Sequence, residues 1–200
     1  MADAFPNRPP LAVGSIGPRA SGFSGMALLI VSEAGVFAYL FFAYYYFSIQ
    51  PQYGPWPPNG PPTFLYSAPQ SAVMLAGCAS MWWANRSAAR GDRLMVWLGL
   101  LATLILALGF IVLQFLDWYD KPFSLATSAY SSFYFIITGT HLVHVVGGAL
   151  MILAVLVWSL FGYFGPVRHV PITITALYWY FLTVAWLWLF FTIYGTPRLT

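Results

Sequence analysis

Five apolar segments, each close to the length needed to cross a bilayer, dominate this 200-residue sequence. A transmembrane helix needs about 20 predominantly apolar residues, because the hydrocarbon core of a bilayer is about 30 Å thick. The sequence therefore predicts an all-α, polytopic membrane protein with five transmembrane helices. The expected spans run from about Met26 to Phe47, Phe64 to Ala84, Leu94 to Leu116, Phe133 to Trp158 and Ile172 to Tyr194.

The composition indicates the same class of protein. Hydrophobic residues make up 60% of the chain and charged residues only 6%, whereas soluble domains are about one-quarter charged. The 9 Trp, 13 Tyr and 17 Phe residues suit a membrane protein with aromatic belts at its interfaces. The formal net charge of +3 is small and the basic residues form no cluster, so we expect no nucleic-acid partner.

The connections divide the chain into one transmembrane domain and two tails. Residues 1–24 contain several Pro and Gly residues and no continuous apolar core before residue 23, so we expect an irregular cytoplasmic tail and no cleavable signal peptide. Residues 25–195 form the predicted five-helix domain, and residues 196–200 a short external tail. A proline-rich stretch at 51–62 cannot be helix interior, and residues 85–93 are expected to form a short basic connection.

The distribution of Lys and Arg predicts the orientation. With five spans, the N-terminal tail lies on the same side of the membrane as the second and fourth connections. That side carries Arg8, Arg19, Arg86, Arg90, Arg93 and Arg168, while the other carries Lys121 and Arg198. Basic residues accumulate on the cytoplasmic side of membrane proteins. We therefore expect a cytoplasmic N-terminus and an external C-terminus.

Three ionisable residues inside the expected spans are candidates for function, because such residues are costly in a bilayer. Glu33 has apolar sequence on both sides and must be protonated, paired or close to water. It could handle protons or contact lipid or a partner, or it could be a polar staple between helices. His141 and His144 lie three residues apart, on neighbouring parts of one helix face.

The spacing of the two membrane histidines does not suit a haem. A bis-histidine haem needs ligands on opposite sides of its iron, and these two side chains project from one helix turn. A metal site would need further ligands, and only Glu33 is available because His169 lies in a cytoplasmic connection. The single cysteine, Cys78, excludes a disulfide and is expected to be a small packed residue. We expect no catalytic residue, cofactor or metal in this chain.

Depth in the membrane suggests a partner for the glutamate. At about 1.5 Å of rise per residue, Glu33 lies about 10 Å from the cytoplasmic side and His144 about 14 Å. We therefore hypothesise a Glu33–His144 hydrogen bond that joins the first and fourth spans, with His141 facing a separate polar or interfacial neighbour. Gly147 and Gly148 are expected to allow the close approach of these two helices.

Two further polar residues end the third span in the sequence "LQFLDWYD". Asp117 precedes Trp118 and Tyr119, which suit a membrane interface, so a hydrated helix end is expected for Asp117. Gln114 lies one turn earlier. With the glutamate and the two histidines, Gln114 and Asp117 complete the candidate set, which we expect to form a sparse buried polar network or to contact lipid or a partner.

Four stretches of the chain resemble subunit III of the haem–copper oxidases. They are "SEAGVFAYLFFAYYY" (32–46), the run 113–148 that contains "SSFYF" and "GTHLVHVVGG", "YWYFLTVAWLWLFFTIYG" (178–195), and "WPP" (56–58). The motifs occur in the family's order over about residues 24–195, and five spans match the short form of the family. The last helix departs from the family pattern, because Tyr180 and Thr183 stand where the family has His and Asp.

The resemblance implies a non-catalytic accessory subunit of a terminal oxidase that reduces dioxygen to water with coupled proton translocation, using cytochrome c or a quinol. Haem and copper are then expected in partner subunits, and the catalytic subunit I and phospholipid are the expected partners. The expected location is a bacterial-type inner membrane rather than the mitochondrial one. Two alternatives stay open: an accessory subunit of a related nitric oxide reductase, and a small haem-binding membrane protein that uses His141 and His144.

Overall fold

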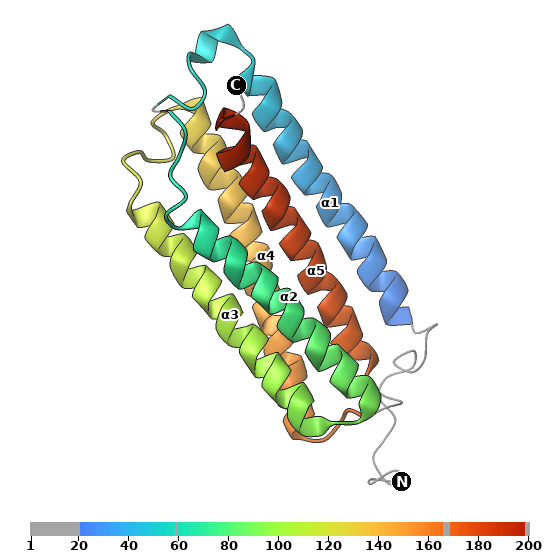
Figure 1. Ribbon diagram of the computed structural model, residues 1–200. Coiled ribbons are helices and arrows are strands. Elements are labelled where there is room, and N and C mark those ends of the chain that lie inside the picture. The colour runs from blue at the N-terminus through green and yellow to red at the C-terminus, as the bar shows by residue number, and fades with distance from the viewer. Residues whose placement is uncertain (1–20, 59, 166–168, 199–200) are drawn as a thin grey trace.

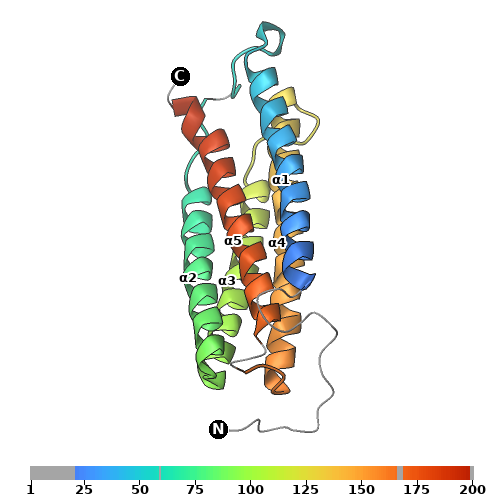
Figure 2. The ribbon, with the colours of Figure 1, turned by 90° about the vertical axis from the view of Figure 1, so that its right-hand side faces the viewer.

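A computed structural model of the chain describes residues 21–58, 60–165 and 169–198. Five long helices lie side by side in one bundle, and successive helices run in opposite directions (Figures 1 and 2). They are α1 (Ser21–Ser48), α2 (Ser67–Arg90), α3 (Arg93–Tyr119), α4 (Ala129–Leu160) and α5 (Val170–Phe190). The described residues include no β-strand, so the predicted all-α class is confirmed.

Four of the five helices are long and apolar enough to cross a membrane. These segments are Gly22–Ser48, Arg93–Tyr119, Ala129–Leu160 and Val170–Arg198. The helix α2 is less apolar, because it contains Gln70, Asn85, Arg86 and Arg90 among many small residues. It nevertheless packs along α3 within the bundle (Figure 1). The second of the five predicted spans therefore stays a prediction.

Two predicted boundaries are wrong. The basic stretch at 85–93 is not a connection, because α2 continues to Arg90 and the turn is confined to Gly91 and Asp92. Gly91 adopts φ 77°, a left-handed conformation that favours glycine, and the Asp92 side chain caps α3 by accepting a hydrogen bond from the Met95 N–H at 3.2 Å.

Residues 21–24 are helical rather than part of an irregular tail. Residues 196–198 form a 3₁₀ turn after a π-helical segment, Phe191–Gly195.

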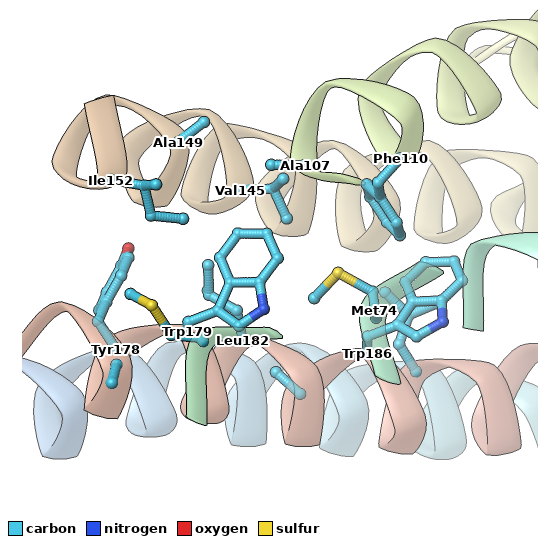
Figure 3. Packing of buried hydrophobic residues seen from close by; sticks show 14 of the residues in the cluster. Met74, Ala107, Phe110, Val145, Ala149, Ile152, Tyr178, Trp179, Leu182 and Trp186 are labelled. Carbon is cyan, nitrogen blue, oxygen red and sulfur yellow. The ribbon is translucent and has the colours of Figure 1, made fainter. Parts of the chain in front are cut away.

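Two tryptophans of α5 lie in the interior of the bundle, where α5 packs against α1, α2 and α4. Trp179 and Trp186 are each 1% exposed, and both indole rings point from α5 into the core (Figure 3). The ring of Trp186 lies 4.9 Å from that of Phe110 on α3. Trp179 fits against the backbone of Gly77 on α2, where an added Cβ would lie 2.9 Å from the indole nitrogen. Small residues on the neighbouring helices thus leave the space that the rings of α5 fill.

The helices α2 and α3 approach each other closely where small residues meet. A Cβ added to Gly99 would lie 2.8 Å from the Cβ of Ala84. The Ser80 hydroxyl donates a hydrogen bond to the Gly99 carbonyl at 2.8 Å and accepts one from Thr103 at 3.1 Å. Small residues with hydroxyl contacts are a common way to join helices that lipid would otherwise surround.

The two ends of the bundle carry different connections. The start of α1, the α2–α3 turn and the α4–α5 connection lie at one end, and the other connections lie with the C-terminus at the opposite end (Figure 1). Arg86, Arg90 and Arg93 belong to the first end, and Lys121 and Arg198 to the second. Of the other arginines that carry the orientation prediction, Arg8, Arg19 and Arg168 lie outside the described residues. The direction of the bundle in a membrane stays a prediction.

Candidate functional site

Glu33 of α1 and His144 of α4 form the hydrogen bond that the sequence predicts. The distance between Glu33 Oε2 and His144 Nε2 is 2.7 Å. The two residues are separated by 111 positions in the chain, so this contact is a long-range tie between the first and fourth helices. It supplies a polar partner for each of two side chains that are costly alone in hydrocarbon.

The other nitrogen of the His144 ring is engaged within α4. His144 Nδ1 lies 2.6 Å from the carbonyl oxygen of Thr140, one turn earlier on α4. A carbonyl oxygen can only accept, so Nδ1 carries a hydrogen and donates it. One proton then lies between Nε2 and Glu33 Oε2, either on the carboxyl group or on the imidazole.

The pair lies near the surface of the bundle rather than at its centre. The side chain of Glu33 is 27% exposed and that of His144 is 15% exposed. The ring of Phe37 covers one side, with its centroid 5.2 Å from that of His144, and Tyr178 of α5 lies close enough to interact electrostatically with Glu33. The carboxyl group is therefore partly accessible at the surface of the bundle.

His141 is engaged separately, as the sequence predicts. It is fully buried, and its Nε2 lies 3.1 Å from the carbonyl oxygen of Leu182 on α5. Because the carbonyl accepts, Nε2 carries the hydrogen. The rings of Phe110 and Trp186 surround it, with centroids 5.4 and 5.3 Å away. His141 thus joins α4 to α5 within an aromatic core, one turn from the Glu33–His144 pair.

Gly147 and Gly148 of α4 lie against α5 rather than against α1. A Cβ added to Gly148 would lie 3.0 Å from Leu182 and 3.5 Å from Trp179, and one added to Gly147 would lie 3.9 Å from the hydroxyl of Tyr178. All three neighbours belong to α5. The glycines therefore admit the large side chains of α5. The expectation that they bring α1 close to α4 is wrong, because the atoms nearest to an added Cβ at either position belong to α5.

Asp117 is buried, so the expectation of a hydrated helix end is wrong. It is 2% exposed, and its Oδ1 lies 2.8 Å from Lys121 Nζ. Its Oδ2 accepts hydrogen bonds from the hydroxyls of Tyr134 and, at 3.3 Å, Tyr194. These four side chains join α3, α4 and the π-helical segment. The neighbouring Trp118 and Tyr119 had suggested that the carboxylate faces solvent, but it is buried and paired with Lys121.

The remaining candidate, Gln114, is also fully buried, and its side-chain amide hydrogen-bonds to that of Gln70 on α2 at 3.1 Å. Sequence reasoning did not find Gln70 or the partners of Asp117. Lys121 could have been found, because it follows Asp117 by four residues on the same helix face. No local pattern identifies Tyr134, Tyr194 or Gln70, because only the fold brings their helices together.

Thr183, which stands in α5 where the family pattern has Asp, forms a hydrogen bond to α2. The Thr183 hydroxyl donates to the carbonyl of Trp179 at 3.1 Å and accepts from the thiol of Cys78 on α2 at 3.2 Å. Cys78 is half-buried and unpaired with any other sulfur. The cysteine is therefore a packed residue, as expected, and it also ties α2 to α5.

No group of three or more His, Cys, Asp or Glu residues is arranged to hold a metal ion in the part of the chain that the structure describes.

Apolar helices of spanning length, joined by buried polar contacts, define a polytopic helical membrane protein. The sequence model of cytochrome c oxidase subunit III matches residues 19–196. The chain belongs to this family.

Individual relatives agree with the family match. Cytochrome c oxidase subunit 3 of Petromyzon marinus is 37% identical over 176 residues, which cover 85% of this chain and 67% of that protein. The proteins of the same name from Papio hamadryas and Danio rerio are each 35% identical over the same extent.

Proposed function

We propose that this chain is a non-catalytic accessory subunit of a haem–copper terminal oxidase, which reduces dioxygen to water with coupled proton translocation. Membership of the subunit III family is the observation that carries the proposal. The names of the relatives favour an oxidase over a nitric oxide reductase. The catalytic subunit I and other respiratory subunits are the proposed protein partners.

Haem and copper belong, in this proposal, to the partner subunits. The geometry of the two membrane histidines supports this assignment. His144 Nε2 is engaged with Glu33, and His141 Nε2 with the carbonyl of Leu182. His144 would have to give up a hydrogen bond to bind iron, because both of its ring nitrogens are engaged. The ring of His141 is enclosed by those of Phe110 and Trp186, and both histidines project from one turn of α4. The alternative of a haem-binding protein therefore has no support from the contacts of these residues.

The proposed role of the chain is to stabilise the catalytic subunit and to bind phospholipid. The outward face of α1 is strongly apolar, with Leu28, Val31 and Tyr39 at 70–71% exposure. Lipid tails or a neighbouring transmembrane helix would cover such a face. The Glu33–His144 pair lies on the inner side of the same helix, where it fixes the position of α1 against α4 and so the shape of the surface that meets lipid.

The proposed arrangement has five transmembrane helices, a cytoplasmic N-terminus and an external C-terminus. The alternating helix directions support it, because they gather Arg86, Arg90 and Arg93 at one end of the bundle (Figure 1). Basic residues of this kind accumulate on the cytoplasmic side. The proposed location is a bacterial-type plasma membrane.

Deletion of the chain tests the proposed role. The remaining complex should retain oxidase chemistry at first, but lose activity faster during turnover or retain less phospholipid. Reintroducing the unaltered chain should restore both properties. Complete loss of oxygen reduction in a complex that still assembles with its full haem and copper content would contradict an accessory role.

A further inference from the structure

Two arginines and two tryptophans gather on the outward face of α2, near its C-terminal end. Trp82 is 58% exposed and Trp83 is 45% exposed, and Arg86 and Arg90 are also exposed. Trp82, Arg86 and Arg90 follow one another at intervals of four residues, so they lie along one side of the helix. These four residues are called the arginine–tryptophan patch below.

Contacts on the other side of α2 fix the direction in which the patch points. The side-chain oxygen of Asn85 accepts a hydrogen bond from the Thr173 hydroxyl of α5 at 2.8 Å. Ala84 is fully buried and meets Gly99 of α3 at the closest approach of the two helices. Because α2 packs against α3 and α5, at the edge of the bundle in Figure 2, the patch faces away from the bundle.

The Arg86 side chain leans back toward the apolar part of α2. Its guanidinium carbon lies 5.7 Å from the centroid of the Trp82 ring, which is within range of a cation–π attraction. Tryptophan side chains concentrate at the level of the lipid headgroups in a membrane. The contact therefore holds a positive charge at the depth where lipid phosphates lie.

The patch carries positive charge without an acidic partner on its own helix. The helix α2 contains no Asp or Glu. Asp92, the next acidic residue along the chain, accepts a hydrogen bond from the Met95 N–H at the start of α3. The ion pairs among the described residues involve neither Arg86 nor Arg90. A negatively charged ligand complements this face, whereas a zwitterionic headgroup brings a positive charge of its own.

The surface beside the patch suits hydrocarbon chains. Toward the middle of α2, the same face continues with Ala79, Ala76 and Leu75, which are all exposed. These side chains have no hydrogen-bonding group that an acyl chain would leave without a partner. A ligand that matches both parts of the face has a negatively charged headgroup and apolar tails.

We propose that the arginine–tryptophan patch binds an anionic phospholipid, with the phosphate against Arg86 and Arg90 and the acyl chains along Leu75, Ala76 and Ala79. Arginine suits this position, because a guanidinium group can bind a phosphate through two parallel N–H groups. The inference rests on the proposed phospholipid-binding role of the chain. It adds the class of headgroup and the residues that select it.

Native mass spectrometry of the purified full chain tests the site, with dioleoyl phosphatidylglycerol or dioleoyl phosphatidylcholine as the probe. The unaltered chain should bind phosphatidylglycerol more tightly. Arg86→Gln/Arg90→Gln should weaken that binding by about fivefold for each arginine and leave phosphatidylcholine binding unchanged. Arg86→Lys/Arg90→Lys is the matched control, because it keeps both charges, and it should retain most of the preference. Circular dichroism should show equal helix content in both variants, since the substituted side chains are exposed.

The outcomes separate the site from the proposed function. A chain that binds neither lipid would overturn both the site and the phospholipid-binding role. A glutamine variant that still prefers phosphatidylglycerol as strongly as the unaltered chain would overturn the site alone. If that variant keeps the lipid preference but loses a subunit that otherwise co-purifies, the arginines contact protein rather than lipid, and the proposal is again overturned.

Discussion

Glu33 Oε2 and His144 Nε2 lie 2.7 Å apart and join two helices whose residues are 111 positions apart in the chain. Because Nδ1 of the same ring donates to the carbonyl of Thr140, the imidazole is oriented independently of the carboxyl group. The pair is therefore preorganised, and its loss should affect the placement of α1 more than the local structure of α4.

The first prediction concerns this pair. Glu33→Gln should be milder than Glu33→Ala, because an amide can still hydrogen-bond to His144. Interhelical hydrogen bonds in membranes contribute on average about 0.6 kcal/mol and at most about 1.7 kcal/mol, so the coupling energy in a Glu33→Ala/His144→Ala cycle should fall in that range. Unfolding of the purified chain in detergent or bilayers measures it. Equal and severe loss of proton uptake by the complex in both glutamate variants would show instead that the titrating charge matters.

A second prediction concerns the closest approach of α2 and α3. Gly99→Ala places a Cβ 2.8 Å from the Cβ of Ala84 and 3.1 Å from its backbone, so one helix must shift. The expected loss of stability is about 1–3 kcal/mol. Gly109→Ala on the same helix is the matched control, because an added Cβ there meets nothing within 4 Å and alanine is the better helix former. If both variants unfold alike, the close approach is not as described.

A third prediction concerns the buried ion pair. Lys121→Met leaves Asp117 buried without its counter-charge, and loss of one member of such a pair costs up to about 3–5 kcal/mol. The double variant Lys121→Met/Asp117→Asn should recover much of the loss, because it removes the unpaired charge and keeps the shape of the side chain. Thermal unfolding compares the two variants. A double variant that is less stable than Lys121→Met would show that the charge of Asp117 is not the source of the penalty.

A fourth prediction concerns orientation. Reporters fused after Gly91, at the α2–α3 turn, should be active in the cytoplasm, and reporters fused after Thr200 should be active outside. This pattern also requires α2 to cross the membrane, although α2 is less apolar than the other long helices. Fusions that report the same side at both positions would contradict the five-span arrangement.

Much of the fold follows from features that the sequence displays locally. Apolar length predicts helices, and depth along the first and fourth spans predicts that Glu33 meets His144. Asp117 shows where local reasoning fails. Its neighbours Trp118 and Tyr119 suit an interface, yet Tyr134 and Tyr194 arrive from distant parts of the chain and enclose it. The glycines of α4 fail for a similar reason, because a close-packing surface does not identify which helix it faces.

The assignment to an accessory subunit is tested most directly by purification through a tag on this chain, followed by an absorption spectrum of the complex and of the chain alone. The complex should contain a larger membrane subunit with haem, and the isolated chain should show no Soret band and no stoichiometric iron or copper. A Soret band in the isolated chain that disappears in His141→Ala or His144→Ala would contradict the account.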